Sequence, residues 1–143
     1  MSRHAEPIRL RLAQGPLGAR QLIEILGFSQ PTLSRSMREL GKEVVRIGAA
    51  RSIQYALRDG ARGLAELEIY RVDPEARIHH LGTLVPVHPD GFVMHEASGA
   101  TLYSDGLPWW MLDMRPQGYL GRAYAARHGR DLDLPERLID WSD

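Results

Sequence analysis

Cysteine is absent from the 143 residues, and lysine occurs once, as Lys42. Without cysteine, disulfides and thiolate metal sites are excluded. Long apolar runs are also missing, since none approaches the roughly 18 residues that suggest a membrane-spanning helix. The N-terminal segment 1–7 lacks the apolar core of a signal peptide. These absences favour a soluble cytoplasmic protein.

Charge is unevenly distributed along the chain, although the formal net charge is zero. Residues 1–62 contain eleven Lys and Arg against five Asp and Glu, whereas residues 63–143 contain seven against thirteen. A basic half suggests a polyanionic partner, and an acidic half does not. The length allows one large domain or two small ones. We therefore expect two modules, 1–62 and 63–143, with a boundary near Gly60 and Gly63.

Three short helices are predicted in the basic module. The first covers about residues 7–14 and the second residues 19–26, where apolar side chains recur at helical spacing. Ser29 is a good N-cap for the third, Pro31 is tolerated in its first turn, and Gly41 ends it. The expected apolar faces are Ile8 and Leu12, then Leu22, Ile23 and Leu26, then Leu33, Met37 and Leu40.

A β-hairpin is predicted to follow. Residues 44–47 form the outgoing strand, residues 48–51 the turn and residues 52–57 the returning strand. Apolar and polar or small residues alternate in the returning strand, which is typical of a strand with one buried face. The alternating sets are Ile53, Tyr55 and Leu57 against Ser52, Gln54 and Ala56.

The segment Ala19–Leu40 resembles the helix-turn-helix of winged-helix transcription regulators. The resemblance depends on the Gly27-Phe28-Ser29 turn together with the Thr32-Leu33-Ser34-Arg35 start of the third helix. It implies an N-terminal winged helix-turn-helix that binds double-stranded DNA, with the third helix in the major groove. Winged helices also serve as protein–protein modules, and that alternative stays open.

The candidate DNA-binding residues have three expected roles. Side chains near the start of the third helix would read base edges, cations farther along would bind phosphates, and the hairpin tip would reach an adjacent groove or phosphate. In that order, these residues are Gln30, Thr32, Ser34 and Arg35, then Arg38 and Lys42, then Arg51, Ser52 and Gln54. Ser29, the expected N-cap, is also included among the DNA-binding residues.

The acidic module is predicted to be a small antiparallel β meander with a C-terminal helix, so the whole chain is expected to be α+β. Its strands are residues 67–72, 78–87, 92–96 and 101–103, separated by turn-forming residues. The helix covers about residues 119–128, with Leu120 and Tyr124 at i, i+4, and Gly129 stops it. Residues 130–143 are expected to be a loop or tail.

The acidic module resembles the first N-terminal subdomain of HipA-like serine/threonine kinase toxins. The residues that carry the resemblance are Ile78–Glu96, Leu107–Trp110 and Arg115–Arg122. The last two look like the HipH/YjjJ-type branch, in which a winged helix precedes the kinase-like part. The resemblance implies a transcriptional regulator in a toxin–antitoxin setting, whose acidic module docks on a HipA-like kinase body in cis or in trans. The alternative is an antitoxin-like subunit that restrains a separate kinase.

Catalysis is not expected from this chain. Kinases of the resembled family need a phosphate-binding loop, a nucleotide-facing lysine, a catalytic aspartate and metal-holding acids, and these lie beyond the resembled part. The sole lysine, Lys42, falls in the expected DNA-binding module. We predict no catalytic residues and no cofactor, and we expect a piece of a longer protein.

Histidine does not indicate a metal site here. His79 and His80 are adjacent, so in a strand they point to opposite faces and cannot easily bind one ion. His88 and His95 fall in a turn and a strand, with no close helical His pair. Strand and turn surface is the favoured interpretation.

A partner-binding surface is predicted at Trp109, Trp110, Met111 and Leu112. Large apolar area favours burial of the tryptophans against the meander, and the alternative is that one ring is exposed and docks a partner. Four consecutive large apolar side chains cannot all point inward. We therefore expect an open surface that also permits a homodimer.

Overall fold

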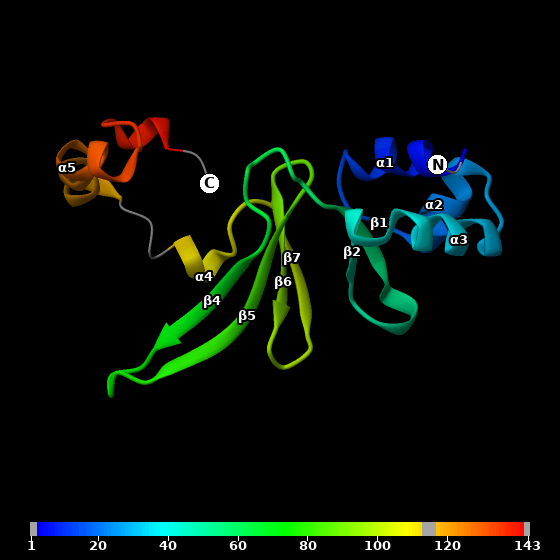
Figure 1. Ribbon diagram of the computed structural model, residues 1–143, viewed down its shortest axis with the longest axis horizontal. Helices are drawn as coiled ribbons and strands as arrows, with labels where there is room; N and C mark the ends of the chain where they lie inside the picture. Colours follow the sequence, from blue (N-terminus) through cyan, green and yellow to red (C-terminus); the bar gives the residue numbers. More distant parts are fainter. Residues whose placement is uncertain (1–2, 113–116, 142–143) are drawn as a thin grey trace. The chain divides into compact units, whose positions relative to one another are not determined.

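The computed structural model describes residues 3–112 and 117–141, which belong to two compact units, Met1–Asp105 and Gly106–Asp143. The chain contains several helices and two antiparallel sheets (Figure 1), which confirms the predicted α+β class. The expected boundary near residue 62 lies inside the first unit. The division into modules 1–62 and 63–143 stays a prediction.

Three helices begin the first unit: α1 (Ala5–Leu12), α2 (Ala19–Leu26) and α3 (Gln30–Leu40). The predicted bounds of α2 are confirmed, and α1 starts two residues earlier than expected. Gly27 ends α2 with a left-handed φ of 65°, which glycine adopts at little cost. The predicted cap of α3 is also confirmed, because Ser29 Oγ accepts from the Thr32 amide at 3.3 Å.

The three helices bury their apolar faces against one another. Figure 1 shows them gathered at the N-terminal end of the first unit. Half-buried side chains of the adjoining strands, Tyr55 and Leu57 among them, cover this cluster. Its buried residues are Ala5, Ile8, Leu12, Leu22, Leu33 and Leu40.

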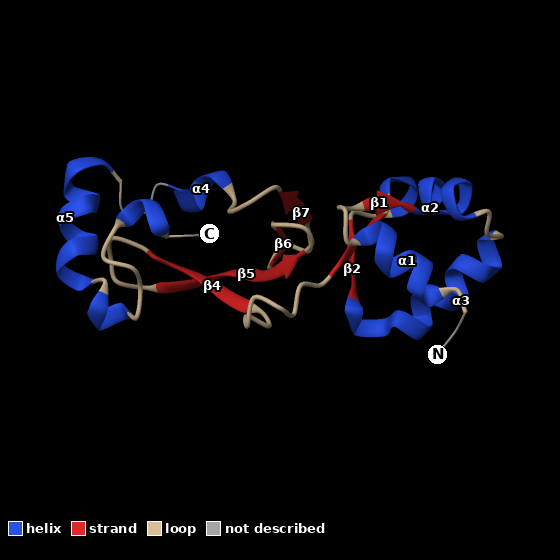
Figure 2. Cartoon of the chain, turned by 90° about the horizontal axis from the view of Figure 1, so that it is seen from above, coloured by secondary structure: helices blue, strands red, loops and turns tan. Residues whose placement is uncertain are grey.

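A three-stranded antiparallel sheet lies beside the helices (Figure 2), in the order β1 (Leu17–Gly18), β3 (Gln54–Leu57), β2 (Val44–Ile47). Two 3₁₀ turns complete this part, η1 (Gly41–Glu43) after α3 and η2 (Ala50–Ser52) in the β2–β3 turn. The predicted hairpin is confirmed, and its returning strand begins at Gln54 rather than at Ser52.

The second sheet is the predicted antiparallel meander, in the order β4-β5-β6-β7. Its strands are β4 (Leu67–Val72), β5 (Ile78–Val87), β6 (Gly91–Glu96) and β7 (Thr101–Ser104). Because β6 pairs only with Gly82–Val87 of β5, the outer parts of β4 and β5 extend as a two-stranded arm (Figure 1).

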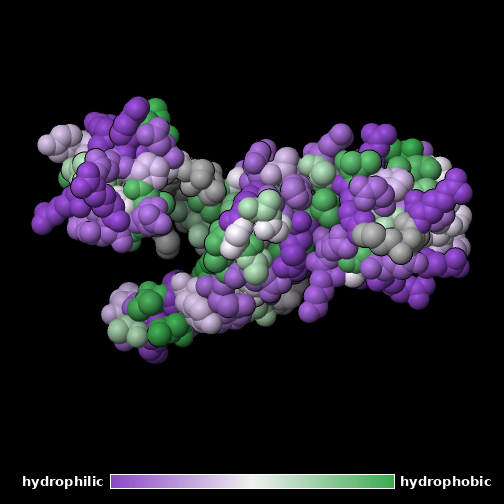
Figure 3. Space-filling view, turned by 45° about the horizontal axis from the view of Figure 1, so that its top comes forward, coloured by the Kyte–Doolittle hydropathy of each residue, from purple (hydrophilic) through white to green (hydrophobic). Residues whose placement is uncertain are grey.

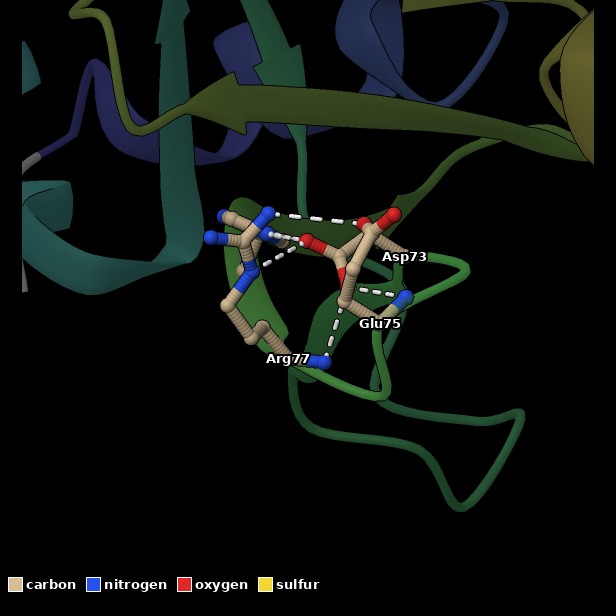
Figure 4. A network of polar contacts seen from close by, with 4 residues as sticks. Asp73, Glu75 and Arg77 are labelled. Atoms are coloured by element: carbon tan, nitrogen blue, oxygen red, sulfur yellow. Dashed lines mark hydrogen bonds and ion pairs between the residues drawn. The ribbon is translucent and has the colours of Figure 1, made fainter.

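Asp73 organises the turn at the end of this arm (Figure 4). Its Oδ1 accepts from the backbone amides of Glu75 at 3.1 Å and Arg77 at 2.8 Å. Its Oδ2 lies 2.9 Å from Arg77 Nε and 2.8 Å from His79 Nε2. The His79 hydrogen bond, followed by the Arg77 amide, holds the pKa of the Asp73 carboxyl below its ordinary value.

Exposed apolar side chains lie close to this turn. Tyr70, Val72 and Ile78 are exposed on β4 and β5, and hydrophobic residues gather at the end of the arm in Figure 3.

The two sheets share a hydrophobic cluster within the first unit. The first sheet contributes Val45, Ile47 and Ala56, which pack with Val85, Val87 and Val93 of β5 and β6. Tyr103 of β7 is half-buried against this cluster. Ala56 is fully buried, so the expectation that it lies on the uncovered face of its strand is wrong. The reason is tertiary, because both faces of β3 are covered, one by helices and the other by the meander.

The connection between the sheets is fixed by a buried ion pair. Arg62 Nε lies 3.0 Å from Asp59 Oδ2, and Asp59 is only 5% exposed. The Arg62 guanidinium also donates to the carbonyls of Val87 at 3.1 Å and Pro89 at 3.3 Å. Asp59 Oδ1 lies 3.7 Å from His88 Nε2. These contacts tie the chain after β3 to the β5–β6 turn.

The second unit contains α4 (Trp109–Leu112), α5 (Gly118–His128) and two 3₁₀ turns, η3 (Arg130–Leu132) and η4 (Leu138–Asp140). The predicted helix before Gly129 is confirmed. Its Leu120 is 79% exposed, while Gly121 and Ala125 are buried. The helix therefore packs through its small residues and leaves its large apolar ones outside. The segment expected to be a loop contains both 3₁₀ turns.

Candidate nucleic-acid interface

The outer face of α3 presents four of the predicted residues. Gln30, Ser34, Arg35 and Arg38 are all exposed. The opposite face is held in place by the helix cluster, since Leu33 and Leu40 are nearly inaccessible. The apolar spacing of the sequence therefore determines which face of α3 is left for a ligand.

Ser29 and Thr32 stabilise the start of α3. Their hydroxyl oxygens lie 2.8 Å apart, and Ser29 Oγ also caps the Thr32 amide. Thr32 is half-buried, whereas Ser29 is exposed. Both side chains set the position of the first turn of α3, which carries Gln30.

Several basic residues of the first sixty-two are neutralised by carboxylates. Arg9 binds Glu43 through two hydrogen bonds of 2.7 and 2.9 Å and also contacts Glu6 at 3.1 Å. The Glu43 contact raises the pKa of the Arg9 guanidinium and lowers the pKa of the Glu43 carboxyl. Arg58 likewise pairs with Glu66 at 2.7 Å.

The cations that were predicted to bind DNA differ from Arg9 and Arg58. Arg35, Lys42 and Arg51 are exposed, and within the described part of the chain none of them forms an ion pair with a carboxylate. Arg38 Nε makes one long contact of 3.4 Å to the Ser34 carbonyl of its own helix. These side chains keep their charge available to an external anion.

The β2–β3 turn carries the other predicted residues. Arg51 and Ser52 lie in η2, Gln54 begins β3, and all three are exposed. Ser52 Oγ donates to the Ala49 carbonyl at 2.9 Å, which shapes the turn that presents Arg51.

A groove of about 1030 Å³ joins the turn to the helices. Gln30 of α3 lines it together with Arg51, Ser52 and Gln54, so the structure brings these four predicted residues to one concave surface. The first turn of α2 adds Arg20 and Gln21, which the sequence analysis missed. The only sequence signal for them was their place at the start of a helix. Lys42 lies in η1, at the other end of α3.

The predicted partner-binding residues fall in the second unit. Trp109 is 78% exposed, so the favoured interpretation, burial of the tryptophans against the meander, is wrong for Trp109. Trp110 and Met111 are half-buried. Leu112 ends α4, and its side chain lies outside the described residues, as do Arg115 and Pro116 of the family-like motif.

The adjacent histidines of β5 contact different carboxylates. His79 Nε2 lies 2.8 Å from Asp73 Oδ2, and His80 Nε2 lies 2.6 Å from Glu68 Oε2. The His80 hydrogen bond is the main reason why the pKa of the Glu68 carboxyl is lowered. Over residues 3–112 and 117–141, no three metal-binding side chains gather as a candidate ion site.

These features define an α+β protein with an exposed basic helix and hairpin next to a β meander. A family described as "YjjJ-like toxin, middle domain" matches residues 64–143. The chain is also 35% identical over 133 residues to Toxin YjjJ of Escherichia coli strain K12. The chain therefore belongs to the YjjJ-like toxin family, which confirms the resemblance to that branch.

The alignment with Toxin YjjJ covers 92% of this chain but 30% of the relative. No solved structure matches the chain. Among the helices of the described residues, none has the length and apolarity needed to cross a membrane.

Proposed function

We propose that this chain supplies the DNA-binding and docking parts of a YjjJ-like toxin system and acts there as a transcriptional regulator. Residues 1–62 form a winged helix-turn-helix in this proposal. Helix α3 enters the major groove, and the β2–β3 turn is the wing, defined here as Gly48–Ile53. The groove residues Arg20 and Gln21 then lie beside the DNA backbone.

The observation that carries the proposal is the availability of cations on one helix and one turn. Arg35 and Arg38 on α3, and Arg51 on the wing, are exposed without carboxylate partners among the described residues. Arg9, Arg58 and Arg62 are instead engaged by acids. Unneutralised cations of this kind are the side chains that neutralise DNA phosphates and release their counterions. The element order helix, helix, helix, hairpin supports the winged-helix assignment.

Duplex binding tests the proposal. Fluorescence anisotropy over a salt series should show affinity that falls steeply with salt, because counterions are released from phosphates. Arg35→Ala should cost about 1–3 kcal/mol and relax sequence preference, since a base-reading arginine discriminates by that amount. Arg51→Ala should weaken binding to all duplexes about equally, whatever their sequence. Arg71→Ala, which removes an exposed arginine of β4, is the matched control and should leave affinity unchanged. No binding at low salt to random or upstream DNA would refute the proposal.

The second part of the proposal is docking on a kinase-like body, in cis or in trans. Three large apolar side chains of the second unit favour it, because Trp109, Tyr119 and Leu120 are each close to 80% exposed. A partner that covers these side chains would remove their apolar area from water. If the chain is instead an antitoxin-like subunit that restrains a separate kinase, it uses the same side chains. In a homodimer, a second copy of this chain would cover them.

Calorimetry with the remaining region of Toxin YjjJ, made separately, tests the docking. Binding that Trp109→Ala weakens supports a kinase-like partner. Concentration-dependent sedimentation of this chain alone, abolished by Trp109→Ala, supports a homodimer instead. A monomer that binds nothing would reject both.

We further propose that the chain has no kinase activity of its own. The proposal is motivated by the single lysine, Lys42, which follows α3 in the DNA-binding part. Calorimetric titration with ATP and Mg²⁺ should show no binding. A micromolar ATP site would overturn this proposal and leave the DNA-binding one intact.

A further inference from the structure

The wing and the β6–β7 turn lie next to each other, although they are far apart in the sequence. The Gly48 amide, at the start of the wing, donates to Thr101 Oγ1 at 2.6 Å. Thr101 is the first residue of β7 and directly follows the turn Ala97–Ala100. Both turns project from the lower side of the first unit in Figure 1.

This neighbourhood is held by packing as well as by one hydrogen bond. Val45 and Ile47 of β2 lie in the same cluster as Val93 of β6, with Tyr103 of β7 against it. The two hairpins, β2–β3 and β6–β7, therefore share a core at their base. Separation of the two hairpins would therefore expose that cluster.

The composition of the β6–β7 turn suits close approach to a polyanion. All four residues, Ala-Ser-Gly-Ala, are exposed and uncharged. Gly99 has a φ of 96°, which favours glycine, and a Cβ there would meet nothing within 4 Å, so the turn is open on that side. Small side chains leave room for a phosphate backbone, which exposed main-chain groups often contact.

We infer that the β6–β7 turn is a second wing, which lies against the DNA backbone beside the first wing and extends the contact into the meander. The inference rests on the proposed DNA-binding function. It assigns part of the DNA contact to the segment matched by the toxin middle-domain family, residues 64–143.

One acidic group lies close to this second wing. Glu96, the last residue of β6, accepts a hydrogen bond of 3.0 Å from Ser98 Oγ. A carboxylate beside phosphates weakens binding by repulsion. Glu96→Gln keeps an acceptor for Ser98 and removes the charge, so it should tighten DNA binding.

A charge series at Ala97 tests the inference with the full chain and duplex DNA. Ala97→Lys should add one phosphate contact, which steepens the loss of affinity between 50 and 200 mM salt by about threefold. Ala97→Glu should weaken binding at low salt. The matched controls are Val72→Lys and Val72→Glu, on the exposed outer end of β4, and they should leave binding unchanged.

The possible results separate the two proposals. Opposite effects of lysine and glutamate at Ala97, without effects at Val72, support the second wing. Equal responses at the two positions, or no response at Ala97 while the parent chain binds DNA, overturn it and leave the DNA-binding function standing. A parent chain that binds no DNA overturns both. Far-ultraviolet circular dichroism of each variant checks that a loss of binding is not a loss of fold.

Discussion

The cluster shared by the two sheets predicts that the helices and the meander of the first unit unfold together. Val93 of β6 is fully buried in that cluster and pairs in register with Val85 of β5. Val93→Ala removes two methyl groups from a site with no exposed surface. At about 0.8 kcal/mol for each buried carbon, plus the cavity left behind, the expected loss is about 2–3 kcal/mol of unfolding free energy.

Hydrogen exchange followed by mass spectrometry measures this loss separately in each element. If the first unit is one cooperative body, slowly exchanging amides of α3 and of β6 should both exchange roughly 30- to 150-fold faster in Val93→Ala, the factor that corresponds to 2–3 kcal/mol. Val72→Ala is the control, because Val72 is 64% exposed and its truncation should change stability by less than about 0.5 kcal/mol. Faster exchange confined to the meander, with α1–α3 unchanged, would refute the reasoning and show two independent bodies.

Three further predictions concern local contacts. Ser29→Ala removes the cap of α3 and should lower stability by about 1 kcal/mol in urea unfolding, whereas an unchanged midpoint would contradict a capping role. Asp59→Asn leaves the Arg62 charge without its buried partner and should cost about 3 kcal/mol, seen as a lower Tm; a variant as stable as the parent would show that the pair contributes little. The carboxylate of Asp73 has a lowered pKa, so its stabilising effect is present above the ordinary aspartate pKa of about 4 and is lost as pH falls through the lowered value. The stability gap between the parent and Asp73→Asn should therefore shrink as pH falls from 6 to 2, and a gap that is constant with pH would contradict the ionic contribution.

Local signals in the sequence predicted most of the elements. The bounds of α2 and β5 and the cap of α3 followed from apolar spacing, Gly27 and Ser29. The meander followed from alternating strands divided by turn residues. Such features act within a few residues of one another, so the sequence displays them without knowledge of the fold.

The candidate site was only partly predictable. The exposed face of α3 is the complement of its apolar stripe, so Arg35 and Arg38 could be named from the sequence. The groove that joins Gln30 to Arg20 and Gln21 depends on how α2 and the wing pack, and no spacing in the sequence shows it. The ion pairs that neutralise Arg9 and Arg58 also join residues far apart in the chain.

The sequence by itself determined the local elements, the α+β class and the resemblance to the YjjJ-like toxin branch. Only the tertiary structure decided which surfaces are covered. Ala56 is buried because the meander packs on its strand, whereas Trp109 of α4 is 78% exposed. The physical reason is that periodicity reports the face that each element tends to bury. Whether a second face is covered, or an apolar face is left open, depends on elements that are distant in the chain.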